Sequence, residues 1–456
     1  MNASENRLGT EKINTLVLRT GIPLMLSLLI NSLYNFVDSV FVSHVAEDAL
    51  TALSLAAPVQ ILVSALGLGN AVGLNAAISR AMGEKNREQV HKTASAAIFL
   101  AGCAWVLISA VCLIGVGWYF DWQSKGNETI AAYGRDYLAI CMLFSLGQMG
   151  QWVFDRFVIA SGKSHLFLFT LSAASVTNLI LDPVFIFVLG LETKGAAIAT
   201  VIGQFVGLLA GILINRRWNR EITFSFTLRP DRKSVYAILR VGIPSTLVQV
   251  LTSFVTVAMN SILLAFSSTA VAVYGVCSRM MHLCTVGVHG IDNGLIPIAA
   301  YNYGARKPGR IRAAVRWGMV YSVLFYIVFL LVLECFPQVV LHLFNASEHM
   351  LAIGIPAVRI LGLSWLISIP GLVIAAAMQG LSQPRPSMLL TTLRQAVLPV
   401  GLAFALSTVG SLNMVWLSFV IAEAVCVPLA LRLWKGKTDT ILKPMEKQQD
   451  PGIAGT

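Results

Sequence analysis

Long apolar runs, each of the length needed to cross a bilayer, dominate the hydrophobic pattern of this chain. A bilayer core requires roughly 20 apolar residues per helix, and charged residues, Gly or Pro separate runs of that size. Twelve runs meet this criterion, which predicts an all-α polytopic membrane protein with twelve transmembrane helices. The predicted spans are residues 15–43, 50–79, 93–119, 131–160, 166–189, 195–215, 236–264, 269–301, 313–336, 351–379, 387–407 and 413–434.

Composition supports the same class of protein. Of the 456 residues, 56% are hydrophobic and only 12% are charged, about half the usual charged share of a soluble protein. A soluble chain could not cover its surface with so few polar groups, which excludes soluble enzymes and disordered regulators. The net charge of +11 is spread over short clusters between apolar runs, so it indicates contact with anionic lipid and no nucleic-acid partner.

The basic residues also predict the orientation in the membrane. The N-terminus and every second loop carry 27 of the 33 Lys and Arg residues, whereas the opposite loops carry only three. Cytoplasmic loops are enriched in these residues, so both termini are predicted to face the cytoplasm. The predicted parts are an N-terminal cytoplasmic tail (1–14), an N-terminal six-helix lobe (15–215), a cytoplasmic linker (216–235), a C-terminal six-helix lobe (236–434) and a C-terminal cytoplasmic tail (435–456).

An internal repeat has a constant offset of 221 residues. Arg19-Thr-Gly-Ile-Pro23 returns as Arg240-Val-Gly-Ile-Pro244, and further matches at this offset occur in the second and fifth spans. A fixed offset in three regions indicates duplication of a six-span unit. Because six is even, both repeats begin on the cytoplasmic side and are parallel, an arrangement that some transporters use to form a substrate cavity.

Two spans carry a polar stripe that includes a carboxylate. Asn31, Asn35 and Asp38 share one face of the first span with Tyr34, and Ser175, Asn178 and Asp182 share one face of the fifth. Carboxylates inside a bilayer are costly and are therefore candidate sites, although hydrogen bonding between helices is an alternative role. Carboxylate and amide oxygens bind a small cation such as Na⁺, and two carboxylates also share a proton, so either ion fits these residues.

A third polar group lies in the eighth span. Arg279, His282, His289 and Asn293 share a face, with Asp292 three residues after His289; they either line a cavity or pair with one another. Glu423 has no partner that the sequence identifies. Motifs for nucleotide binding, metalloprotease or serine-hydrolase chemistry are absent from the sequence, which predicts that the chain is not an enzyme and uses no cofactor.

Several of these motifs together resemble the multidrug and toxic compound extrusion (MATE) family of prokaryotes. The motifs are the Arg-x-Gly-Ile-Pro start of each repeat, INSLYNFVDSVFV, GLNAAISRAMGEKN and NLILDPVFIF. The resemblance implies two lobes around a central cleft and export of cationic or amphipathic drugs, driven by H⁺ or Na⁺ influx. It further implies a coupling site at Asp38, Asn178, Asp182 and Thr200, with Tyr137 lining the same cavity. Carboxylates that another branch places in the seventh and tenth spans have no counterpart here.

The resemblance also implies where the protein acts and what it contacts. The expected location is the cytoplasmic membrane of a prokaryote, and the expected partners are small-molecule substrates and membrane lipid, with the monomer as the functional form. Two other hypotheses stay open: a flippase or exporter of a lipid-linked or metabolite substrate on a related fold, and a membrane-embedded enzyme or receptor.

Overall fold

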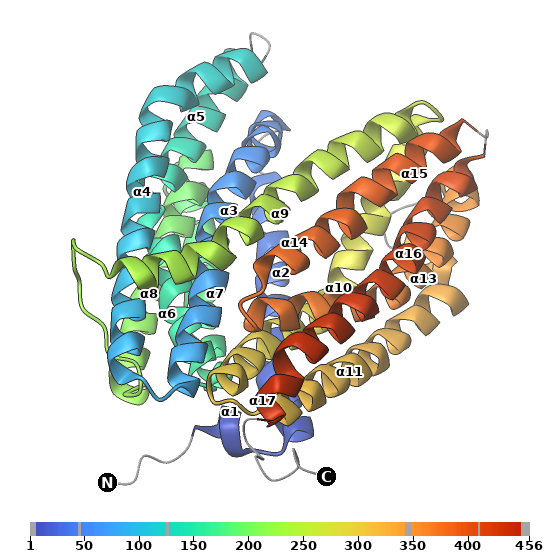
Figure 1. The fold of residues 1–456 in the computed structure, drawn as a ribbon. Coiled ribbons are helices and arrows are strands. Elements are labelled where there is room, and N and C mark those ends of the chain that lie inside the picture. The colour runs from blue at the N-terminus through green and yellow to red at the C-terminus, as the bar shows by residue number, and fades with distance from the viewer. Residues whose placement is uncertain (1–5, 44–46, 125–126, 343–347, 409–410, 448–456) are drawn as a thin grey trace. The chain divides into compact units, whose positions relative to one another are not determined.

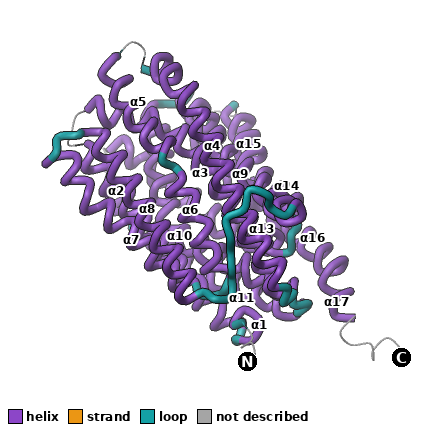
Figure 2. The backbone as a smooth tube through the Cα atoms, turned by 90° about the vertical axis from the view of Figure 1, so that its left-hand side faces the viewer, coloured by secondary structure: helices purple, strands orange, loops and turns teal. Residues whose placement is uncertain are grey.

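The computed structural model describes residues 6–43, 47–124, 127–342, 348–408 and 411–447, and these residues form helices and loops without a strand (Figure 2). The first half contains α1 (Arg7–Thr10), α2 (Ile13–Ser43), α3 (Glu47–Gly83), α4 (Arg87–Gln123), α5 (Glu128–Leu143), α6 (Leu146–Ala160), α7 (Ser164–Pro183), the π-helix η1 (Val184–Val188) and α8 (Glu192–Trp218). The second half contains α9 (Arg232–Leu264), α10 (Ser268–Gly304), α11 (Pro308–Cys335), α12 (Pro337–His342), α13 (Glu348–Gly380), α14 (Pro384–Thr392), η2 (Leu393–Val397), α15 (Leu398–Ser407), α16 (Leu412–Lys437), η3 (Thr438–Leu442) and α17 (Lys443–Lys447).

The helices confirm the predicted membrane fold (Figure 1). Among the described residues, eleven helices are long and apolar enough to cross a bilayer, and a bent pair makes up to twelve. That pair is α5 and α6, which meet at an angle of 44°. The hydrophobic pattern predicts one continuous span over residues 131–160 and gives no sign of this bend.

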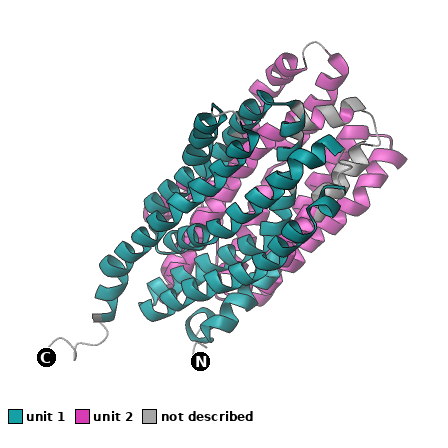
Figure 3. Cartoon of the chain, turned by 90° about the vertical axis from the view of Figure 1, so that its right-hand side faces the viewer, with its two compact units in different colours: residues 1–25, 247–456 teal, residues 26–246 magenta. Residues whose placement is uncertain are grey.

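The chain forms two compact units that differ from the two sequence repeats (Figure 3). Unit 1 contains Met1–Met25 and Leu247–Thr456, and unit 2 contains Leu26–Thr246. Both boundaries lie inside the first helix of a repeat, two residues after Pro23 in α2 and after Pro244 in α9. The boundaries are 221 residues apart, the same offset as the repeat. Each repeat therefore places the start of its first helix in the compact unit built mainly from the other repeat.

Glycines on the second helix of each repeat permit this exchange. In unit 1, a Cβ atom on Gly290 of α10 would lie 2.7 Å from the backbone of Met25 in α2. In unit 2, a Cβ atom on Gly69 of α3 would lie 2.8 Å from the carbonyl oxygen of Gly242 in α9. Real Cβ atoms do not approach backbone so closely, so both contacts require glycine. The repeated glycines are thus packing sites for the exchanged helices.

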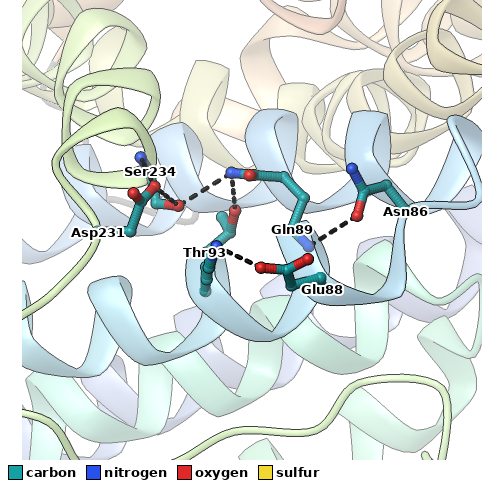
Figure 4. A network of polar contacts seen from close by, with 7 residues as sticks. Asn86, Glu88, Gln89, Thr93, Asp231 and Ser234 are labelled. Carbon is teal, nitrogen blue, oxygen red and sulfur yellow. Dashed lines mark hydrogen bonds and ion pairs between the residues drawn. The ribbon is translucent and has the colours of Figure 1, made fainter.

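Polar contacts attach the start of α9 to α4 within unit 2 (Figure 4). The Asn86 side chain accepts a hydrogen bond from the Gln89 backbone N–H at the start of α4, and Gln89 donates to the Ser234 hydroxyl at 2.9 Å. Asp231 accepts from both the hydroxyl and the backbone N–H of Ser234. These hydrogen bonds lower the pKa of Asp231 below its ordinary value.

The first and last described helices are held at the same end of α11 in unit 1. Lys307 donates to the Gly9 carbonyl, and Arg310 donates to the Leu8 carbonyl beside it. Arg312, close to Arg310 on α11, forms an ion pair with Glu446 of α17. Because α1 and α17 meet the same end of one helix, they lie on the same side of unit 1, which agrees with an even number of spans.

Candidate ion-binding site

Three of the four predicted coupling residues come together between α7 and α8 in unit 2. The Asn178 side-chain amide donates hydrogen bonds to the Asp182 carboxylate and to the Thr200 hydroxyl, both at 3.2 Å. Asn178 and Asp182 are one turn apart on α7, as their spacing predicts, and Thr200 reaches them from α8. The packing of two helices therefore creates a cluster that neither helix forms alone.

The cluster is removed from solvent. Asp182 is fully buried and Asn178 is 2% exposed, with Ser175 buried one turn before Asn178 on the same face of α7. Gly203 allows α8 to approach this face, since a Cβ atom there would lie 2.8 Å from the Ala174 carbonyl oxygen. A carboxylate in this environment requires a proton, a cation or a full set of donors to offset the loss of hydration.

A change of helix type follows the carboxylate. Pro183, directly after Asp182, ends the α-helical part of the span, and the π-helical turn η1 covers the next five residues. Proline has no N–H to donate and disturbs the helix before it. π-helical turns are rare and occur frequently at functional sites, so the backbone marks the position of Asp182 as unusual.

The hydrogen-bond directions leave oxygen atoms facing one another. Asn178 uses its N–H groups toward Asp182 and Thr200, which leaves its carbonyl oxygen buried and without a hydrogen-bond donor among the described residues. A buried amide oxygen next to a carboxylate is an acceptor-rich environment. Such a site is suited to a small cation or a proton, and to no anion.

The structure describes the other predicted residues of this site to different extents. The backbone of α2 is helical through Asp38, but the side chains of Tyr34, Asn35 and Asp38 lie outside the described residues. Asn31 is half-buried on the same helix. Tyr137, on α5, is 5% exposed and its hydroxyl accepts a hydrogen bond from Gln60 of α3 at 3.2 Å.

The eighth-span group does not pair internally among its described side chains. Asn293 donates to the backbone carbonyl of His289 on its own helix, α10. His282 is exposed, His289 half-buried and Asp292 7% exposed, and the Arg279 side chain lies outside the described residues. The described members therefore form a gradient of burial along α10.

Sequence reasoning missed a buried ion pair in unit 1. Arg394, in η2, donates to the Glu423 carboxylate of α16 at 2.9 Å, and both residues are buried. Glu423 has a strong partner, contrary to what its isolated position in an apolar run suggested. The only sequence signal was an arginine inside a span, and no pattern connects two residues on different helices.

Metal binding by a cluster of acidic, histidine or cysteine side chains has no support in the described part of the chain, where no group of three such residues converges. Any cation at the α7–α8 site would therefore use amide and hydroxyl oxygens together with carboxylate. Such oxygen ligands suit hard ions rather than transition metals.

The comparison with protein families identifies the chain. The MatE family model matches residues 23–184 and again residues 244–422, well over half of the sequence. The chain belongs to the MatE family. The two matches begin at Pro23 and Pro244, 221 residues apart, which confirms the internal repeat.

Individual relatives agree with this assignment. The chain is 25% identical to the multidrug export protein MepA of Staphylococcus haemolyticus over 412 residues, 90% of both chains. A solved outward-facing multidrug resistance MATE transporter of the MOP superfamily is 25% identical, with 98% of this chain and 100% of that chain covered and a TM-score of 0.89. A MOP superfamily transporter from Pyrococcus furiosus, described as having a binding pocket of reverse polarity, is 25% identical over 97% of this chain and 99% of that chain, with a TM-score of 0.89. The MatE chain is accordingly a multi-pass membrane transporter and not an enzyme.

Proposed function

We propose that this MatE protein is a secondary active antiporter that exports organic cations and amphipathic drugs, driven by influx of H⁺ or Na⁺. The observation that carries the proposal is the buried Asn178–Asp182–Thr200 cluster, in which one amide contacts both a carboxylate and a hydroxyl. Its acceptor-rich oxygens suit the driving ion. The relative's description as a multidrug export protein supports the choice of substrate class.

The proposed mechanism places ion binding at Asp38, Asn178, Asp182 and Thr200. An ion neutralises buried negative charge and thereby changes the relative stability of the transporter's conformations. Pro23 and Pro183 weaken the helical hydrogen bonding of the first and fifth spans, so these positions are where the spans bend as the site fills. Linkage requires that a bound substrate weaken ion binding by the same factor as the ion weakens substrate binding.

Transport measurements separate the driving ions. Inside-out membrane vesicles that contain the protein are placed under a pH gradient or a Na⁺ gradient alone, and uptake of a fluorescent organic cation is followed. We expect uptake with one of the two gradients and none without a gradient. Gradient-independent uptake, or no uptake of cations with either gradient, contradicts the antiporter. Transfer of a lipid-linked cargo in place of the cation supports the flippase alternative.

The proposed location is the cytoplasmic membrane, with the monomer as the functional form and both termini and the 216–235 linker on the cytoplasmic side. A cysteine at Leu228, which is 90% exposed, tests the orientation in a cysteine-free protein. We expect an impermeant thiol reagent to label it in inside-out vesicles and not in intact cells, and labelling of intact cells contradicts the orientation. Asn219 is unsuitable for this test because it is buried and bonded to the Phe157 carbonyl.

A further inference from the structure

Three charged side chains from three helical segments meet inside unit 1. Arg394 of η2 donates to Glu423 of α16 at 2.9 Å, and Asp292 of α10 interacts electrostatically with the same guanidinium. All three segments belong to the second repeat. The cluster is built from residues other than those of the α7–α8 site.

Burial makes the cluster unusual. Arg394 is 4% exposed, Asp292 is 7% exposed and Glu423 is 8% exposed. Gly371 of α13 leaves room for the arginine, because a Cβ atom there would lie 3.1 Å from the Arg394 Cδ atom. The helices pack around the charges instead of exposing them to the surface.

The charges of the cluster do not balance. Two carboxylates face one guanidinium, which compensates only one of them. One oxygen of Glu423 and one oxygen of Asp292 are buried and have no hydrogen-bond donor among the described residues. A buried, uncompensated carboxylate is unfavourable, and binding of one proton removes both the net charge and the need for a donor.

The neighbouring ionisable groups provide a route for that proton. His289 lies one turn before Asp292 on α10 and interacts electrostatically with both Arg394 and the exposed His282. Cys426, one turn after Glu423 on α16, also interacts electrostatically with the pair. The part of α13 around Gly371, residues 364–378, contains no ionisable side chain. The histidines therefore connect exposed surface with the buried carboxylates.

We propose that Asp292, Arg394 and Glu423 form a second proton-binding site, which holds one H⁺ shared between its two carboxylates and exchanges it through His289. Protonation forms one O–H bond on a carboxylate, while the other carboxylate stays ionised against Arg394. The fixed guanidinium repels Na⁺, which makes the site selective for a proton. The repeat mates are Ala71, Ala173 and Ile202, so the first repeat lacks this site.

Infrared difference spectroscopy between acidic and alkaline pH tests the site without any transport measurement. The background protein carries Asp38→Asn, Asp155→Asn and Asp182→Asn, which remove the interior carboxylates of the first repeat. We expect a C=O stretching band of a buried, protonated carboxyl group in this background at acidic pH. Absence of the band overturns the proposal.

Two further variants test the sharing of the proton. In the background protein, Asp292→Asn leaves Glu423 paired with Arg394, and Glu423→Gln leaves Asp292 as the only carboxylate beside Arg394. Each variant balances the charge, so we expect each to abolish the band. A band that persists in both variants, or in one of them, overturns the shared proton.

Isotopic labelling covers the case in which a variant fails to fold. Carboxyl-¹³C aspartate and glutamate are introduced separately into the background protein, and the position of the band is recorded. We expect the band to shift to lower frequency with at least one of the two labels, because the heavier carbon slows the C=O vibration. A band that shifts with neither label overturns the assignment. Since efflux is not measured, failure of this proposal is distinct from failure of the antiporter proposal.

Discussion

The two repeats build polar clusters on equivalent helices with opposite chemistry. In the first repeat, α7 and α8 hold an amide, a hydroxyl and a carboxylate; in the second, η2 and α16 hold a guanidinium and a carboxylate. Both fifth spans contain a π-helical turn beside the buried charge, η1 directly after Asp182 and η2 around Arg394. The shared backbone irregularity thus survives although the side chains differ.

This difference separates two ways of keeping charge inside a bilayer. Arg394 is a permanent positive charge built into the protein, so it compensates Glu423 at all times. The α7–α8 cluster contains no basic residue among its described members, so its compensating charge has to come from outside. A removable ion suits a transport cycle, whereas a fixed ion pair suits the stability of one helix arrangement.

The largest expected effect comes from removing the carboxylate of the first cluster. Asp182→Asn should abolish ion-driven efflux of a fluorescent cation in vesicles while leaving the protein folded, because no charge remains for the ion to compensate. Asp136→Asn, which removes an exposed ion pair with Lys194, is the matched control and should transport normally. Wild-type efflux by the Asp182 variant would remove the basis of the comparison.

The second cluster should respond in stability first. Arg394→Met leaves Glu423 buried without its guanidinium, and breaking such a pair costs about 3–5 kcal/mol of unfolding free energy. Arg394→Met combined with Glu423→Leu removes both charges and should recover most of that loss. Thermal unfolding of the purified protein measures both variants. Equal destabilisation by the single and double variants would show that the ion pair is not the cause.

The exchanged helices predict matching effects in the two repeats. Gly69→Ala and Gly290→Ala each place a methyl group against backbone, at an expected cost of about 1–3 kcal/mol. Gly102→Ala is the control, because no neighbouring side chain or helix lies within 4 Å of where its methyl group would be. Thermal unfolding again provides the measurement. A destabilisation confined to one repeat would contradict a symmetric exchange.

The smallest expected effect concerns the hydroxyl of the first cluster. Thr200→Val keeps the shape of the side chain and removes the acceptor for Asn178, which costs about 1 kcal/mol or roughly fivefold in ion affinity. Thr200→Ser retains the hydroxyl and should bind the ion nearly as well as the wild type. Ion titration of the purified protein distinguishes them, and equal affinities for Val and Ser would exclude Thr200 from the site.

Part of the candidate site could be predicted from the sequence. The one-turn spacing of Asn178 and Asp182 is a local property of a helix, so periodicity places them on one face. The position of Thr200 beside them came only from family resemblance, because contact between α7 and α8 is not a local property. The partner of Glu423 could not be predicted for the same reason, since 29 residues separate it from Arg394.

The sequence by itself determined the membrane fold and the internal repeat, because a bilayer selects apolar length and a duplication preserves spacing. Only the tertiary structure decided the bend between α5 and α6, the exchange of the first helices between compact units, and which charged groups meet. Those features depend on packing between distant segments, where shape and the burial of charge determine the outcome rather than hydrophobic pattern.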